Sequence, residues 1–171
     1  MLFAKQPDVA SAAASSSKRV PDGPYIDENT IEAALARLRN AHPLAKIHSP
    51  IEVIAAYSAA DKSTLLAPSG QWTIFPLCHR YEHWTLLACK GGDWYQYDSL
   101  SHDKYRVDAQ SAAIQLGAPV AFPLNMAAQR ENECGALMVL AAKKLLSKIF
   151  DEELPVAQEA REELKALIAG R

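Results

Sequence analysis

Three short segments of the chain carry the residue types of a thiol-based catalytic site. The first places His83 before Trp84, the second places Asp98 after Tyr97, and the third is a polar stretch that leads into Cys134. A cysteine nucleophile needs a nearby imidazole that accepts or shares its proton. The imidazole in turn needs an acid that holds its orientation and tautomer. The chain therefore contains a possible His-Asp-Cys set for acyl-transfer chemistry.

Predicted strands and a predicted helix indicate how these three residues would meet. Residues 83–89 and 94–97 read as two strands joined by a two-glycine turn. His83 begins the first strand and Asp98 follows the second, so antiparallel pairing brings both to the same end of the hairpin. Cys134 opens a long apolar helix, and a helix N-terminus stabilises a thiolate electrostatically. We expect this helix start to dock against that end of the sheet.

Neighbouring residues have expected roles in binding. Gln129 lies five residues before Cys134, in the loop that would line the oxyanion site, and the backbone N–H of Cys134 is a second candidate donor. Gly135 lacks a β-carbon, so a substrate backbone could approach closely there. The large flat side chain of Trp84 would form one wall of a narrow slot.

Each of these residues also has a structural interpretation. A cysteine before an apolar helix is commonly a small buried hydrophobe, a strand histidine commonly lies at the surface, and an aspartate after a strand commonly ends a turn. The joint order His, Asp, Gln, Cys-Gly favours catalysis, because each residue type falls where the geometry needs it. Cys78 and Cys89 are expected in or beside the sheet, and the other histidines are expected in loops or on helix flanks, namely His42, His48, His79 and His102.

The remaining periodicity predicts an α+β protein. Asp27 is the expected N-cap of a first helix, and Pro50 favours the start of a second one. Helices are expected over residues 27–40, from 49 onward, and over 107–116, 134–149 and 155–168. Strands are expected over residues 72–75, 83–89, 94–97 and 119–122.

Length and composition fit one soluble domain with its own core. The chain has 171 residues, of which 49% are hydrophobic, and a formal net charge of -2. This balance gives no global signal for nucleic acid or an anionic membrane, and no run approaches the roughly 18 apolar residues of a membrane span. Three cysteines without a CxxC pair predict neither a disulfide framework nor a zinc site, and they fit a reducing compartment. We expect no metal and no cofactor.

The N-terminal residues 1–23 are expected to be a disordered leader or linker, and residues 24–171 a single domain. Residues 10–17 contain only alanine and serine, without the continuous apolar region of a secretory signal peptide. Two interpretations stay open: a linker from a longer protein, or the export leader of a bacterial effector.

Together these motifs resemble the ubiquitin-like-protein-specific cysteine proteases, which include SUMO proteases, a NEDD8 protease and bacterial effector deubiquitinases. The resemblance covers about residues 24–150. It is carried by the aromatic and acidic opening at residues 25–31, by Pro76 ahead of the His-Trp pair, by Tyr-Asp-Ser-Leu at residues 97–100, and by the segment 129–135.

The resemblance implies a papain-like cysteine protease fold, with a central mixed sheet flanked by helices and the nucleophile at the N-terminus of a central helix. It implies that His83 is the general base, Asp98 its orienting acid, Cys134 the nucleophile and Gln129 the oxyanion-hole donor. The implied reaction is attack on the carbonyl of a C-terminal glycine, which gives a thioester that is then hydrolysed.

The implied partners are ubiquitin, SUMO or NEDD8, whose Gly-Gly tails are joined to a lysine or a short extension. Tyr25, Asp27, Trp84 and Gly135 are the expected contacts of that tail. The resemblance further implies a monomer, and the alanine-rich leader favours a bacterial effector acting in the cytoplasm or nucleus of a host cell.

The chain departs from the family pattern at three positions. Glu133 replaces the usual aspartate before the cysteine, Tyr25 replaces a tryptophan, and Gln129 precedes Cys134 by five residues where the family more often has six. Two alternatives stay open. Some bacterial relatives of YopJ type use the same three side chains for acetyl transfer, and a catalytically silent module would only bind the modifier.

Overall fold

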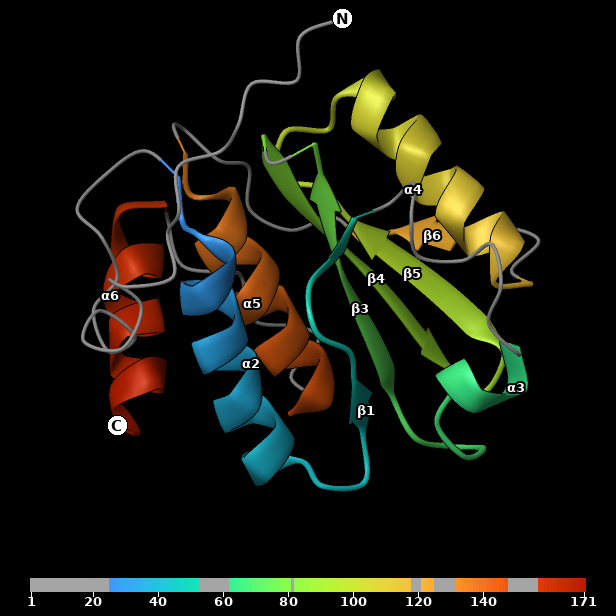
Figure 1. Cartoon of the computed structure of the whole chain (residues 1–171), viewed down its shortest axis with the longest axis horizontal. Coiled ribbons are helices and arrows are strands. Elements are labelled where there is room, and N and C mark those ends of the chain that lie inside the picture. The colour runs from blue at the N-terminus through green and yellow to red at the C-terminus, as the bar shows by residue number, and fades with distance from the viewer. Residues whose placement is uncertain (1–24, 53–61, 81, 118–120, 125–131, 148–156) are drawn as a thin grey trace, which may run out of the picture.

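The structure, a computed structural model, describes residues 25–52, 62–80, 82–117, 121–124, 132–147 and 157–171 (Figure 1). A six-stranded mixed sheet runs through its centre in the order β1-β3-β4-β5-β6, with β2 also beside β3. The strands are β1 (Lys46–Ile47), β2 (Ile51–Glu52), β3 (Thr73–His79), β4 (His83–Lys90), β5 (Asp93–Tyr97) and β6 (Ala121–Pro123). β4 is antiparallel to β3 and β5, whereas β1 and β2 run parallel to β3 and β6 runs parallel to β5.

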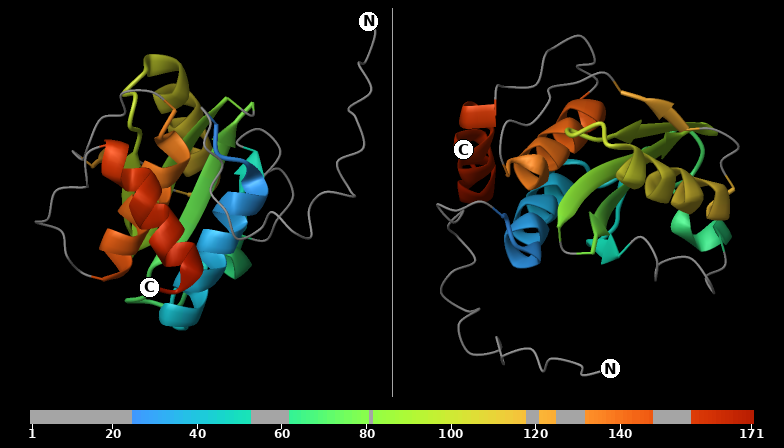
Figure 2. Two further views of the ribbon diagram at one scale, coloured as in Figure 1. Left: turned by 90° about the vertical axis from the view of Figure 1, so that its left-hand side faces the viewer. Right: turned by 90° about the horizontal axis from the view of Figure 1, so that it is seen from above.

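Helices cover both faces of this sheet. They are α2 (Glu28–Ala41), α3 (Lys62–Leu65), α4 (Asp103–Gln115), α5 (Cys134–Leu146) and α6 (Ala157–Ala169). α2, α5 and α6 pack on one face, and α3 and α4 lie on the other (Figures 1 and 2). This arrangement confirms the predicted α+β class with a central mixed sheet flanked by helices.

β4 separates two hydrophobic cores, because successive side chains of a strand point to opposite faces. Leu86 packs in the core beneath α2, α5 and α6, whereas Leu87 and Cys89 pack in the core beneath α4. By the same alternation His83 lies on the α4 side of the sheet and Trp84 on the α5 side. The side chains of the first two residues of β4 therefore lie on opposite faces of the sheet.

α5 is a core helix that begins at the predicted residue, Cys134. Residues 134–142 are all buried, because β4 lies against one side of the helix while α2 and α6 cover others. A helix that is apolar all round is stable only in such surroundings. Within the described residues, no helix is both long enough and apolar enough to cross a membrane.

The helix expected from residue 49 onward is wrong where the structure describes it. Ile51–Glu52 is the strand β2, which pairs with Leu77 and Cys78 of β3. Extended pairing there satisfies backbone groups along β3 that a helix would leave without partners. The rest of that prediction, over residues 53–61, lies outside the described residues.

β3 continues through Pro76, where the sequence suggested that the strand would end. The carbonyl of Ile74 accepts a hydrogen bond from the N–H of His48 on the β1 side, so Pro76, two residues later, faces the same side. β1 ends at Ile47 and β2 starts at Ile51. Proline has no N–H to donate, and it is tolerated because it faces this gap between two short partners.

The first turn of α5 approaches α2 and β4 closely at Gly135. A β-carbon there would lie 3.0 Å from Cδ1 of Ile31, 3.2 Å from Cβ of Ile26 and 3.3 Å from Cδ1 of Trp84. All three neighbours are buried, so they have little freedom to withdraw. Gly135 thus sets how near the helix start lies to the sheet.

Gly135→Ala is expected to destabilise the fold by about 1–3 kcal/mol, because overpacking at this site outweighs the better helix propensity of alanine. Chemical denaturation measures the change. The double variant Gly135→Ala with Ile31→Val tests the cause, since valine lacks the methyl group that lies nearest. The two substitutions should then be less than additive. Additive losses of stability would show that contact with Ile31 is not the cause.

Candidate active site

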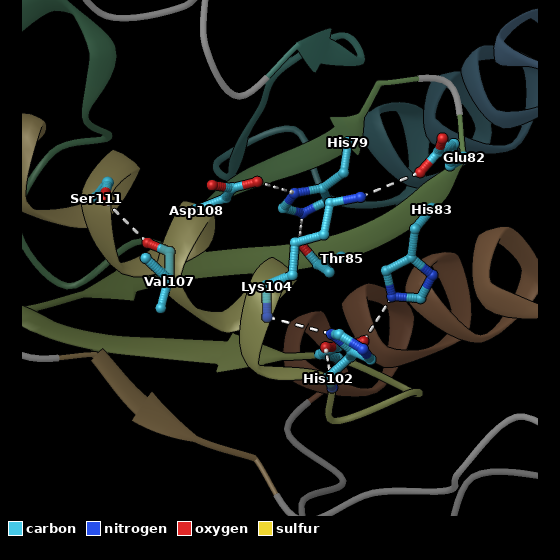
Figure 3. Close-up of polar contacts among 10 residues, drawn as sticks. His79, Glu82, His83, Thr85, His102, Lys104, Val107, Asp108 and Ser111 are labelled. Atoms are coloured by element: carbon cyan, nitrogen blue, oxygen red, sulfur yellow. Dashed lines mark hydrogen bonds and ion pairs between the residues drawn. The ribbon is translucent and has the colours of Figure 1, made fainter.

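His83 and Asp98 form a short hydrogen bond at the end of the β4–β5 hairpin. Nε2 of His83 lies 2.6 Å from Oδ1 of Asp98 (Figure 3). The register pairs Leu86 with Tyr97, so Asp98 leaves β5 beside the first residues of β4. This is the juxtaposition that the predicted hairpin requires.

The loop after β5 fixes the carboxylate of Asp98. The backbone N–H of Leu100 donates to Oδ1 at 2.9 Å, and that of His102 donates to Oδ2 at 3.2 Å. Burial raises the pKa of Asp98, but the hydrogen bonds from His83 and from the two N–H groups outweigh burial and lower it below its usual value. Asp98 is therefore ionised, and a carboxylate can only accept a hydrogen bond. The proton between the two groups thus lies on Nε2 of His83, which determines the tautomer of the imidazole.

The thiol of Cys134 is the second group that acts on the imidazole of His83. Nε2 already faces Asp98, so Nδ1 is the nitrogen left for the sulfur. Burial alone would lower the pKa of His83, but its hydrogen bond to Asp98, its interaction with Cys134 and the negative charges of both groups raise it to about 9. An imidazolium is thus stable beside the sulfur at neutral pH.

The N-terminus of α5 adds favourable electrostatics at Cys134. Glu133 is the N-cap residue, but its side chain makes no capping hydrogen bond. The N–H groups of the first turn therefore keep the partial positive charge of a helix start. Negative charge on the sulfur, or on an oxyanion formed next to it, is stabilised at this position. The three side chains can together present a nucleophilic sulfur and move a proton.

Tyr25 and Trp84, two predicted substrate contacts, stack on each other with ring centroids 6.4 Å apart. Nε1 of Trp84 donates to the carbonyl of Ile26 at 3.2 Å, and Trp84 is 1% exposed. Burial and a hydrogen bond with Cys78 raise the pKa of Tyr25 far above its usual value, so its phenol is neutral. Trp84 thus packs in the core. Its burial does not indicate an exposed side chain that forms the wall of a substrate slot.

Asp27 and Gly135 likewise have structural roles. Oδ1 of Asp27 accepts a hydrogen bond from the N–H of Thr30 at 2.7 Å, which confirms the predicted N-cap of α2. The space that Gly135 leaves is taken by buried core side chains. The close approach that the structure shows at Gly135 is therefore that of the core. Substrate contact by either residue stays a prediction.

Gln129 lies outside the described residues, so its oxyanion role also stays a prediction. Cys78 and Cys89 are buried in β3 and β4, as expected. Among the residues that the structure describes, no group of three His, Cys, Asp or Glu side chains is arranged to hold a metal ion.

Sequence reasoning missed two side chains next to His83. His79, expected in a loop, lies in β3 directly opposite His83 and is 2% exposed. Its alternation with Phe75 and Leu77 was the available signal. Tyr105, in the first turn of α4, has its ring centroid 4.4 Å from that of His83. Nothing in the sequence distinguishes Tyr105 from other polar residues of that helix.

No protein-family model matches the sequence, and no curated protein matches it. Solved structures do match. The C-terminal protease domain of Ulp1, in complex with Smt3, the yeast ortholog of SUMO, aligns with a TM-score of 0.65 at 14% identity, over 85% of this chain and 77% of that one.

Two bacterial structures also match. XopD of Xanthomonas, described among ubiquitin-like protein proteases, aligns with a TM-score of 0.56 at 21% identity, over 83% of this chain and 99% of that one. The central domain of the uncharacterized protein Lpg1148 of Legionella pneumophila aligns with a TM-score of 0.56 at 11% identity, over 86% of this chain and 99% of that one. The chain therefore has the fold of the Ulp1-type cysteine proteases, as its motifs predicted.

The pH dependence of stability should report the His83–Asp98 pair. The pKa of His83 in the folded state, about 9, exceeds the unfolded value of about 6.5. Its protonation therefore stabilises the fold fully below pH ~6.5, and this contribution is lost as the pH rises to ~9. We expect it to be at most about 3 kcal/mol. Asp98→Asn should lower the pKa of His83 and flatten this pH dependence.

Denaturation of the two forms at pH ~6.5 and ~9, with NMR titration of His83, measures this effect. Asp93→Asn is the matched control, because Asp93 is exposed at the far end of the same strand. An unchanged His83 titration in Asp98→Asn would contradict the assignment.

Two substitutions distinguish helix capping by Asp27 from substrate binding by Asp27. Asp27→Ala removes the cap and should cost about 1 kcal/mol, whereas Asp27→Asn keeps a capping oxygen and should cost far less. Thermal unfolding measures both, with Glu28→Ala, exposed in the same turn, as control. A higher KM in Asp27→Asn at unchanged stability would instead assign the carboxylate to substrate binding.

Proposed function

We propose that the chain is a cysteine isopeptidase or endopeptidase that cleaves after the Gly-Gly tail of SUMO or ubiquitin. The observation that carries this proposal is the imidazole of His83, which is hydrogen-bonded to the carboxylate of Asp98 and interacts electrostatically with the thiol of Cys134 at the start of α5. That arrangement suits nucleophilic catalysis by a thiol. The substrate class is supported by the fold, because the similar domain of Ulp1 is in complex with a SUMO ortholog.

In the proposed reaction, His83 takes the proton of the Cys134 thiol. The sulfur attacks the carbonyl carbon of the terminal glycine, so that a C–S bond and an oxyanion form. The backbone N–H of Cys134 and the side chain of Gln129 are the proposed donors to this oxyanion.

The oxyanion then collapses and the C–N bond breaks. The imidazolium of His83 gives its proton to the departing amine, which leaves a thioester on Cys134. A water molecule, deprotonated by His83, hydrolyses the thioester and releases the glycine carboxylate and the thiol. Asp98 keeps the imidazole oriented through both halves of the cycle.

We further propose that residues 24–171 act as a monomeric protease domain in a reducing compartment. None of the three cysteines is in a disulfide, and a catalytic thiol needs reducing conditions. Two of the similar structures come from bacteria, Xanthomonas and Legionella pneumophila. This supports a bacterial effector that deconjugates SUMO or ubiquitin in the host cytoplasm or nucleus, with residues 1–23 as an export leader or a linker.

Activity-based probes provide the test. Ubiquitin, SUMO and NEDD8, each ending in a glycine electrophile, are incubated with the folded protein, and adducts are located by mass spectrometry. We expect a SUMO or ubiquitin probe to add to Cys134, because the thiolate attacks at the position of the glycine carbonyl. Cys134→Ala should abolish the adduct and His83→Ala should slow it by about a hundredfold or more.

Cys89→Ala is the matched control, because Cys89 is a buried thiol of the same strand as His83 but lies in the α4 core. It should leave labelling unchanged. If no probe reacts with protein that is folded by circular dichroism, the proposed substrate class is wrong. Acetylation of Cys134 by acetyl-CoA in the same assay would favour the acetyltransferase alternative.

A further inference from the structure

Tyr105 packs its ring over the imidazole of His83. The two ring centroids are 4.4 Å apart, and the ring planes are inclined by 33°. Tyr105 comes from α4, which contributes no group to the proposed chemistry. Its contact with His83 therefore calls for an explanation of its own.

The one hydrogen bond that His83 makes, from Nε2 to Asp98, does not by itself fix the plane of the imidazole. The torsion between Cβ and the ring is broad for histidine, because it joins a tetrahedral carbon to a planar one. Packing against a ring face restricts this torsion, and Tyr105 supplies such packing.

Tyr105 is itself held from several sides. The ring of His79 meets it edge-on, with centroids 5.2 Å apart and planes inclined by 65°. The carboxylate of Glu82 interacts with its hydroxyl electrostatically, and the Nζ atom of Lys104 lies 5.2 Å from its ring centroid. Lys104 also pairs with Glu82 at 3.4 Å (Figure 3). The ring is thus restrained from the sheet and from α4.

His79 docks α4 onto the sheet at this point. Its Nε2 atom lies 2.7 Å from the hydroxyl of Thr85 on β4, and its Nδ1 atom lies 3.7 Å from Oδ2 of Asp108 on α4 (Figure 3). Burial and the neighbouring His83 lower the pKa of His79 to about 4. A neutral His79 supports Tyr105 without placing a second positive charge beside His83.

We propose that Tyr105 is a positioning residue for His83, which holds the plane of the imidazole and favours its protonated form in the ion pair with Cys134. This inference rests on the proposed role of His83 and Cys134 in catalysis. The face of a tyrosine ring is electron-rich and attracts a cation placed over it. The same contact that orients the ring therefore also stabilises the imidazolium relative to the neutral imidazole.

The other charged or titratable groups around His83 do not provide this contact. Asp98 bonds the ring through Nε2, Cys134 acts on it through its charge, and His79 lies across the strand pair with its centroid 6.1 Å away. On the α4 side, His102 and Lys104 contact Tyr105, and Glu82 interacts with the Tyr105 hydroxyl electrostatically. Tyr105 is thus the aromatic residue through which α4 acts on His83.

The pH dependence of Cys134 alkylation tests the proposal without any modifier. The rate of iodoacetamide addition is measured across pH, and peptide mass spectrometry separates Cys134 from Cys78 and Cys89. Iodoacetamide reacts with the thiolate form of a cysteine. If Tyr105 favours the imidazolium, and with it the thiolate at neutral pH, removal of Tyr105 should slow alkylation at neutral pH and leave the rate at alkaline pH unchanged, because hydroxide then deprotonates the thiol without help from His83.

Four variants give the comparison. Tyr105→Ala and Tyr105→Leu should lower the alkylation rate of Cys134 at neutral pH by about tenfold and leave the rate at alkaline pH unchanged. Tyr105→Phe keeps the ring without the hydroxyl, so it should match the unmodified protein. Val107→Ala, an exposed change on the same helix, should leave the profile unchanged. Leucine fills much of the same volume, which keeps the test valid if Tyr105→Ala does not fold.

An alkylation profile in folded Tyr105→Leu that matches the unmodified protein would overturn the proposal. An equal loss in Tyr105→Phe would also overturn it, because the hydroxyl of Tyr105, and not its ring, would then be the cause. With a reactive modifier probe, Tyr105→Leu should lower the maximal rate and leave KM unchanged. Absence of probe activity in the unmodified protein contradicts only the proposed substrate class, because the alkylation profiles are still measurable.

Discussion

The close approach of α5 to β4 is the constraint on which the candidate site depends. Gly135 has no side chain, so the first turn of α5 can lie against Ile26, Ile31 and Trp84. The preceding residue, Cys134, is thereby placed where its thiol acts on the imidazole of His83. A larger residue at Gly135 would push the helix start outward, and the thiol would move with it. Packing in the core therefore determines geometry in the site.

β4 joins this core constraint to the electrostatics of the site. Trp84 points into the α5 core and helps to seat the helix, while His83, its neighbour, points to the α4 side. The hairpin then brings Asp98 beside His83, where backbone N–H groups of the following loop hold the carboxylate. Two adjacent residues on one strand, His83 and Trp84, thus help to position Asp98 and Cys134, which lie far apart in the sequence.

The hairpin and α5 could be predicted from the sequence because local signals specify them. A two-glycine turn between apolar strands and a continuous apolar run after Cys134 each have one simple interpretation. β1 and β2 could not be predicted, since each has two residues and owes its existence to parallel pairing with β3. Tertiary pairing therefore overrode the helix signal of Pro50.

Within the site, residue types predicted His83, Asp98 and Cys134 as neighbours, but they did not predict what surrounds these side chains. His79 reads as a surface histidine until its strand is known, and Tyr105 is brought to His83 only when α4 crosses the sheet. Gly135 and Trp84 were assigned to substrate from their residue types and their positions beside Cys134 and His83. Their burial shows that the core uses them first.

The burial of α5 constrains how the sequence of this protein can evolve. Residues 134–142 have no solvent-facing side, so the helix that carries Cys134 cannot shift without repacking α2, α6 and β4. Substitutions deep in the interior would then alter the reactivity of the thiol as well as stability. Sequence drift in the core and drift in activity are coupled in such a fold, and surface loops are left as the freer region in which specificity can evolve.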